Sequence, residues 1–208
     1  MKTIFGSFLG VAMAALLAGC GSSGGTCSNV EPCGGDIVGT WKVTSSCLTV
    51  DLSEMASGFD CEGAKVSASD FKITGDVTYR ADMTFTRNLT GSVNAVLTLP
   101  AACLTVEGIT LTCAQAQQVL QGSAGDGYSS VTCTGGSTCT CTFVGLPQTM
   151  AATGTYTTTG AGVLTETDQG EAPESTNYCV KGSTLSISEA GAMAGDPTIT
   201  GTVTLTRQ

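Results

Sequence analysis

Residues 36–43, with the sequence DIVGTWKV, decide how the rest of the chain must fold. Ile37, Trp41 and Val43 stand at odd positions, and polar residues stand at positions 40 and 42. Successive side chains of a β-strand point to opposite faces, so this alternation predicts a strand with one apolar face. Such a strand has to bury that face against a second sheet, or against its own sheet closed into a barrel.

The same odd-numbered alternation continues along the chain as far as residue 99. Its apolar members are Phe71, Ile73, Val77, Tyr79, Met83, Phe85, Leu89, Val93, Ala95, Leu97 and Leu99. A weaker alternation returns in residues 139–144, 150–158, 162–167, 177–180, 184–188 and 198–207. Glycine-containing breaks separate several of these segments. The pattern predicts short antiparallel strands joined as hairpins, which form either a sandwich or a barrel.

One helix is predicted near residues 112–122, inside an insertion that covers residues 100–130. Thr112 followed three positions later by Gln115 is a capping-box signature, and Gly122 is a suitable stop. The apolar face of this helix would be formed by Ala116, Val119 and Leu120. Because the helix is short, we expect packing and a cross-link through Cys113 to stabilise it.

The composition excludes several kinds of partner. Of the 208 residues only 12% are charged, and the formal net charge is −9. A chain with so few basic residues cannot assemble the basic face that nucleic acid binding requires. An anionic lipid surface repels it for the same reason, so attachment to a membrane has to come from covalent lipid.

The first residues have the features of an export signal. Lys2 precedes an apolar run over residues 8–17, which is too short to cross a bilayer as a helix. We therefore interpret residues 1–19 as a signal peptide.

The motif Leu17-Ala18-Gly19-Cys20, at the end of this signal, resembles the lipobox of bacterial lipoproteins. The resemblance implies cleavage before Cys20 and attachment of fatty acyl chains such as palmitate, which would anchor the protein in the cell envelope. Gly21-Ser22 after the cysteine is similar to the signal for sorting to the outer membrane, with inner-membrane retention as the alternative. An ordinary signal peptide next to an unmodified Cys20 is a further alternative.

These features divide the chain at Cys20. Residues 20–35 begin with Cys20 and a run rich in Gly and Ser, and they are expected to form a flexible tether. Residues 36–208 are expected to form a single folded domain, a length that suits one core.

The number of cysteines agrees with lipidation at Cys20. There are 11 cysteines in the chain, and an odd number in an exported protein leaves one to be explained. The remaining set is Cys27, Cys33, Cys47, Cys61, Cys103, Cys113, Cys133, Cys139, Cys141 and Cys179. An even set in an oxidising compartment indicates up to five disulfides.

The pairing of these cysteines can be predicted only in part. Short loops favour the local pairs Cys27–Cys33, Cys47–Cys61 and Cys103–Cys113. Cys139 and Cys141 would lie on the same face of a strand, so we expect each to pair with a different partner. Zinc is the competing interpretation of these two thiols, but the chain lacks paired C-x-x-C spacing and contains no histidine, so we expect no metal site.

The element Gly39-x-Trp41 in the first strand resembles the opening motif of lipocalins and their calycin relatives. The resemblance implies an up-and-down antiparallel β-barrel in which Trp41 closes one end and an arginine of the last strand packs across the indole. Arg207 fits that role, because it shares its face with Val203 and Leu205. A cation–π contact between the two residues would contribute about 0.5 to 2 kcal/mol. The alternative is that Trp41 is an ordinary core residue and Arg207 a solvated terminus.

The function expected from this resemblance is binding of a small apolar ligand in the barrel. The candidate lining residues are Phe71, Tyr79, Phe85, Leu97 and Tyr156. The alternative is a structural or interaction lipoprotein whose barrel is filled by its own side chains and whose partner is another envelope protein. Enzymatic activity and a cofactor are not expected, because the chain has no histidine and no glycine-rich phosphate loop. Acidic residues at 166–174 are interpreted as a solvated loop, with calcium binding as the alternative.

Overall fold

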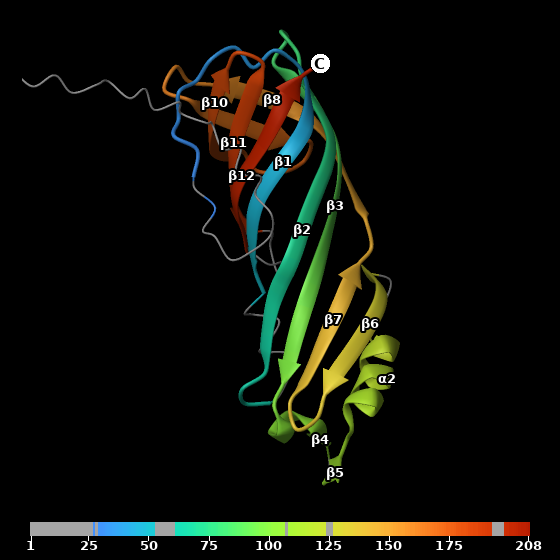
Figure 1. Cartoon of the computed structure of the whole chain (residues 1–208). Coiled ribbons are helices and arrows are strands. Elements are labelled where there is room, and N and C mark those ends of the chain that lie inside the picture. The colour runs from blue at the N-terminus through green and yellow to red at the C-terminus, as the bar shows by residue number, and fades with distance from the viewer. Residues whose placement is uncertain (1–26, 28, 53–60, 107, 124–126, 193–197) are drawn as a thin grey trace, which may run out of the picture.

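The computed structural model describes residues 27, 29–52, 61–106, 108–123, 127–192 and 198–208. Within these ranges the chain is built mainly of antiparallel strands, with one α-helix (Figure 1). The strands are β1 Gly39–Asp51, β2 Lys65–Tyr79, β3 Thr84–Leu99, β4 Thr105–Val106, β5 Ile109–Thr110, β6 Tyr128–Gly135, β7 Cys139–Gly145, β8 Gln148–Thr158, β9 Val163–Asp168, β10 Glu174–Lys181, β11 Thr184–Ala192 and β12 Thr198–Arg207. The helices are the 3-10 helix η1 Ala101–Leu104 and the α-helix α2 Cys113–Ser123.

The main body is a closed up-and-down β-barrel, as the sequence predicted. Its strands follow one another in chain order as β1, β2, β3, β8, β9, β10, β11 and β12, with an insertion between β3 and β8. The last strand, β12, pairs antiparallel with β1 and so closes the barrel. Each apolar face is thereby buried inside the barrel without a second sheet.

Strand β3 belongs to two structures at once. Its first half, Thr84–Gly91, pairs with β8 in the barrel, while its second half, Ala95–Leu99, pairs with β7. Strand β2 pairs with β3 along nearly its whole length. The strands β2, β3, β7 and β6 therefore continue beyond the barrel as a four-stranded sheet, which we call the extension (Figure 1).

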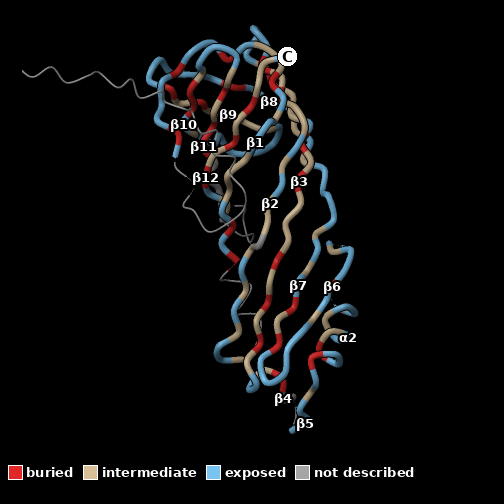
Figure 2. The backbone as a smooth tube through the Cα atoms, in the orientation of Figure 1, coloured by how far each residue is buried: buried red, intermediate tan, exposed pale blue. Residues whose placement is uncertain are grey.

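Buried residues occur in both parts (Figure 2), and the barrel and the extension each contain a hydrophobic core cluster. The barrel core consists of Ile37, Trp41, Val77, Tyr79, Phe85, Leu89, Tyr156, Leu164, Tyr178, Leu185, Ile187, Val203 and Leu205. The extension core consists of Leu97, Leu99, Leu104, Cys113, Ala116, Val131, Cys139 and Cys141. Met83, which the alternation placed with the inward residues, instead lies in the turn between β2 and β3 and is 54% exposed.

The packed part of the chain begins before Asp36. Val30 is buried, and its backbone N–H donates to Ser188 Oγ at 2.9 Å. Cys33 is bonded to Cys179 of β10, and Gly34 forms a parallel bridge with that residue. The segment just before Asp36, expected to belong to the tether, therefore lies against the barrel.

The cysteines form five disulfides, as their number predicted. The pairs are Cys27–Cys47, Cys33–Cys179, Cys61–Cys103, Cys113–Cys139 and Cys133–Cys141. The local pairs predicted from loop length, Cys27–Cys33, Cys47–Cys61 and Cys103–Cys113, are wrong. The sequence separation within the observed pairs ranges from 8 to 146 residues, so sheet pairing and packing, and not closeness in sequence, decide which sulfurs meet. The expectation that Cys139 and Cys141 have different partners is confirmed.

Helix α2 begins with the predicted capping box. The Thr112 backbone N–H donates to Gln115 Oε1 at 2.8 Å, and the Gln115 backbone N–H donates to Thr112 Oγ1 at 3.3 Å. The helix runs one residue beyond Gly122, so this glycine does not stop it. Val119 is exposed, and the face that packs on the extension is carried by residues including Ala116 and Leu120.

Helix α2 also covers the outer edge of β6, the last strand of the extension. Gln117 Oε1 accepts a hydrogen bond from the Cys133 backbone N–H at 2.8 Å. Gln121, one turn later, donates from Nε2 to the Val131 carbonyl oxygen at 3.0 Å. Two glutamines on one helix face thus replace contacts that a neighbouring strand would make, which protects part of this edge from pairing with another chain.

Candidate functional site

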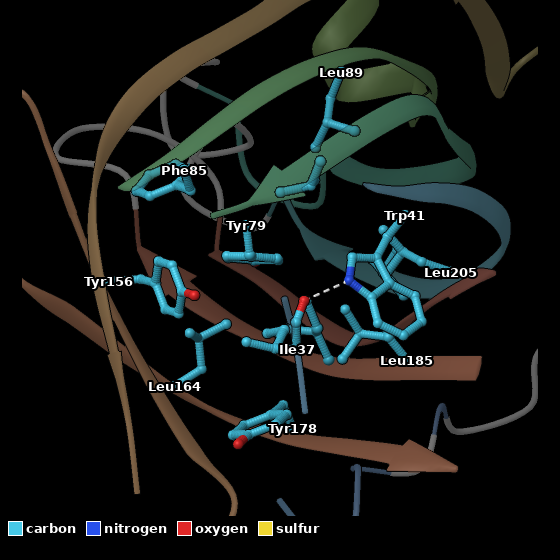
Figure 3. Packing of buried hydrophobic residues seen from close by; sticks show 13 residues of the cluster. Ile37, Trp41, Tyr79, Phe85, Leu89, Tyr156, Leu164, Tyr178, Leu185 and Leu205 are labelled. Atoms are coloured by element: carbon cyan, nitrogen blue, oxygen red, sulfur yellow. Dashed lines mark hydrogen bonds between the residues drawn. The ribbon is translucent and has the colours of Figure 1, made fainter. Parts of the chain in front are cut away.

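Trp41 lies in the barrel core at one end of the pairing of β1 with β12, and it is 0% exposed. Trp41 and Arg207 are direct partners in the pairing of β1 with β12, and the Arg207 guanidinium carbon lies 4.5 Å from the centroid of the indole. The indole Nε1–H donates to the Ile37 carbonyl oxygen at 2.7 Å (Figure 3). Arg207 Nη2 donates to the Asp36 carbonyl oxygen at 2.8 Å. The contact predicted between Trp41 and Arg207 is therefore present.

Gly39 is favoured at this position by its backbone conformation, and it lies beside the Arg207 side chain. Its φ of +144° is disfavoured for residues with a side chain. A Cβ atom added here would also lie 3.6 Å from Nη1 of Arg207. The three residues of the predicted closure, Gly39, Trp41 and Arg207, thus form one structural unit.

Three of the five candidate lining residues meet inside the barrel. The rings of Tyr79 and Tyr156 form an edge-to-face pair with centroids 5.0 Å apart, and the ring of Phe85 lies 6.2 Å from that of Tyr79 (Figure 3). The other two do not join them. Phe71 packs beside the cluster of Val50, Leu52 and Ala95, and Leu97 belongs to the extension core.

A small cavity lies inside the barrel. A cavity of about 90 Å³ is lined by Val43, Ile73, Val77, Tyr79, Arg87, Leu89, Glu166, Glu174, Ser175, Thr176, Ile187, Ser188, Val203 and Leu205. One water molecule occupies about 30 Å³ in the liquid, and pockets for drug-sized ligands begin at about 300 Å³. The cavity therefore has room for a few water molecules but not for a lipid.

A second, wider depression of about 520 Å³ lies over β3, β8 and β9 and is open to solvent. Its walls include Arg80, Asp168, Gln169 and several threonines of these strands. Because this depression is open to solvent, it would leave much of an apolar ligand in contact with water.

The barrel holds a charged cluster that the sequence did not predict. Arg87 of β3 lies between two carboxylates of β9, with Nη1 3.4 Å from Glu166 Oε2 and Nη2 2.7 Å from Asp168 Oδ2. The Tyr79 hydroxyl reaches across the interior and donates to Glu166 Oε1 at 2.8 Å. The acidic residues were interpreted as part of a solvated loop, but only 17% of the Glu166 side chain is exposed. The sequence did contain one indication that Glu166 faces the interior, because Glu166 lies two positions after Leu164 on the same strand face and Leu164 is completely buried.

The environment of Glu166 changes its acidity. Burial raises the pKa of this carboxyl above its ordinary value, while Arg87 and the hydrogen bond from Tyr79 act in the opposite direction. Glu174, the direct cross-strand partner of Glu166 on β10, adds a like charge. Burial also raises the pKa of Tyr156. The cluster ties β2, β3 and β9 together through the barrel interior.

We predict that Trp41→Ala and Arg207→Ala destabilise the barrel non-additively. Loss of the buried indole should cost about 3 to 5 kcal/mol, because it leaves a cavity in the core. In the double variant the cost should be smaller than the sum of the single costs by about 0.5 to 2 kcal/mol, the strength of a cation–π contact. Denaturant unfolding of the four proteins measures this difference, and strictly additive costs would show that the two side chains do not interact.

We further predict that Glu166→Gln changes how stability depends on pH. The folded chain holds the Glu166 proton more tightly than the unfolded chain, whose carboxyl has the ordinary pKa of 4.5. The stabilisation from this group is therefore complete below that pKa and is lost as the pH rises through the raised folded value. The difference in free energy of unfolding between the wild type and Glu166→Gln should therefore decrease as the pH rises through this window. Urea titrations at a series of pH values measure this difference.

The exposed carboxyl of Glu171 provides the control for that measurement. Glu171→Gln removes one acid from the turn after β9 without touching Arg87 or Tyr79. A wild type whose advantage over Glu166→Gln grows with pH would contradict the assigned direction.

Among the residues that the structure describes, no helix is long and apolar enough to cross a membrane. Comparison with protein families, with curated proteins and with solved structures gives no match for this chain.

Proposed function

We propose that this protein is a lipid-anchored lipoprotein of the bacterial cell envelope that acts through its surface, with the barrel as a filled scaffold. The observation that carries this proposal is the barrel interior, where thirteen buried side chains leave a cavity of about 90 Å³. A carrier of apolar ligands needs several times that volume. The alternative of a filled interaction module is therefore favoured over the expected ligand carrier.

The anchor in this proposal is acylated Cys20, at the end of the sequence Leu17-Ala18-Gly19-Cys20. Five disulfides among the ten other cysteines support export to an oxidising compartment. Cys27, bonded to Cys47 of β1, is separated from Cys20 by six residues. An extended chain spans about 3.3 to 3.6 Å per residue, so the tether would hold the barrel within about 25 Å of the lipid.

The extension is the part best suited to meet a protein partner. The barrel closes without it, because β3 already pairs with β8. Its face opposite the extension core carries cross-strand rows of uncharged hydroxyl groups, such as Thr98, Thr140 and Thr134. The disulfides Cys61–Cys103, Cys113–Cys139 and Cys133–Cys141 rigidify it. A rigid polar surface loses little conformational entropy when it binds.

The anchor and the filled barrel can be tested in one preparation. The wild type should fractionate with membranes, and Cys20→Ala should not. Mass spectrometry of the detergent-extracted wild type should find the covalent lipid and no other lipid in stoichiometric amount. Repeated recovery of one non-covalent lipid per chain would instead establish a carrier, and membrane retention of Cys20→Ala would exclude the anchor.

The surface can be tested with a photo-reactive amino acid at two exposed strand threonines. Thr142 lies on the face of the extension opposite the extension core, and Thr157 lies on β8 of the barrel. Irradiation of cells should cross-link the chain with the probe at position 142 to a defined envelope protein, and the chain with the probe at position 157 should give at least tenfold less of that adduct. Equal or absent adducts at both positions would contradict a partner on the extension.

A further inference from the structure

Two disulfides of the extension lie against each other and bring three of their four sulfur atoms into one group, with the fourth, Cys113 Sγ, bonded to Cys139. Cys113–Cys139 joins α2 to β7, and Cys133–Cys141 joins β6 to β7. The Sγ atoms of Cys139 and Cys141 are 3.9 Å apart. The Sγ atoms of Cys133, Cys139 and Cys141 all lie within 4.8 Å of one another. The sequence spacing did not indicate this convergence, because it depends on three elements.

The backbone holds these four residues together independently of the sulfur bonds. Cys139 and Cys141 are two positions apart on β7 and so point to the same face. Cys133 is the direct cross-strand partner of Cys141 in the pairing of β6 with β7. Cys113 is the first residue of α2, which the hydrogen bonds of Gln117 and Gln121 fix on β6. The four thiols would therefore remain neighbours if both disulfides were reduced.

Three of these sulfurs lie about as close together as the sulfurs of a tetrathiolate metal site, and Cys113 would supply the fourth ligand. Zinc binds four cysteine sulfurs tetrahedrally at about 2.3 Å, which places neighbouring sulfurs about 3.8 Å apart. The distance of 3.9 Å between Cys139 and Cys141 agrees with one edge of such a tetrahedron. Both residues are 0% exposed, so the metal would be shielded from water. The N-terminus of α2 at Cys113 favours a negatively charged thiolate.

We propose that Cys113, Cys133, Cys139 and Cys141 form a redox-convertible site, which exists as two disulfides when oxidised and binds one thiophilic divalent cation such as Zn²⁺ when reduced. The reductant is a dithiol: two molecules are oxidised to disulfides and transfer four electrons and four protons to the cluster. Binding of Zn²⁺ to the resulting four thiols then releases four protons. Either form cross-links α2 to the sheet.

The test uses the mature, detergent-extracted protein, reduced with a phosphine under anaerobic conditions and freed of the reductant. Co²⁺ serves as the spectroscopic probe and Zn²⁺ as its competitor. The reduced wild type should bind one Co²⁺ per chain, with the absorption of tetrahedral thiolate coordination, and Zn²⁺ should displace it. The oxidised protein should bind none.

Two double variants locate the site. Cys139→Ser/Cys141→Ser should lower the affinity for Co²⁺ at least a hundredfold, because two of the four ligands are lost. Cys61→Ser/Cys103→Ser, which removes the neighbouring disulfide, should bind like the wild type. Equal binding by both variants would overturn the proposal, since it would assign the metal to other thiols.

Folding is followed in the same samples by circular dichroism and limited proteolysis. If reduction loosens the chain, one equivalent of Zn²⁺ should restore the protease resistance of residues 113–141. A reduced chain that stays folded without binding Co²⁺, or one that Zn²⁺ does not restore, would overturn the proposal.

Discussion

The pairing of the first barrel strand with the last is the constraint on which the rest of the fold depends. If β1 and β12 did not pair, the barrel strands would form an open sheet with two free edges and an uncovered apolar face. The contact of Arg207 with the buried indole of Trp41 stands at the end of this pairing. Arg207 also donates to the carbonyl of Asp36, so the same side chain fixes the segment that enters β1. Arg207 thus contacts both the closing strand pair and the segment that enters β1.

The sequence was sufficient for features that depend on neighbouring residues. Strand alternation and the capping box of Thr112 and Gln115 are local, and both are present in the structure. The disulfide partners could not be predicted, because Cys113 meets Cys139 only after α2 has packed on β7. The position of Leu97 was misjudged for a related reason. Alternation shows which face of a strand is buried, but not whether that face lines a barrel or an open sheet.

The interior of the barrel shows where residue type misled the interpretation. Glu166 and Asp168 are charged and were assigned to a solvated loop, yet they lie on β9 and pair with Arg87. The charge of Glu166 and Asp168 suggested that they face solvent. Both residues share a strand face with buried Leu164, which indicated that they face the interior, and the position on the strand was the more reliable indicator. The two carboxylates are tolerated inside the barrel for two reasons. Arg87 partly neutralises their charge, and the Tyr79 hydroxyl donates a hydrogen bond to Glu166. Tyr79, Phe85 and Tyr156 pack against one another in the interior, because aromatic residues fill a small barrel as readily as they line one.

The barrel and the extension differ in how far each depends on disulfides for its stability. Among the described residues, the barrel core contains thirteen buried side chains, and the two disulfides of the barrel attach the N-terminal segment. The extension has a smaller core and receives the other three. A small core leaves little stability after conformational entropy is subtracted, so cross-links contribute a larger share there. A change of redox state would therefore act first on the extension, while the barrel, held by packing and by the closure at Trp41, would keep its form.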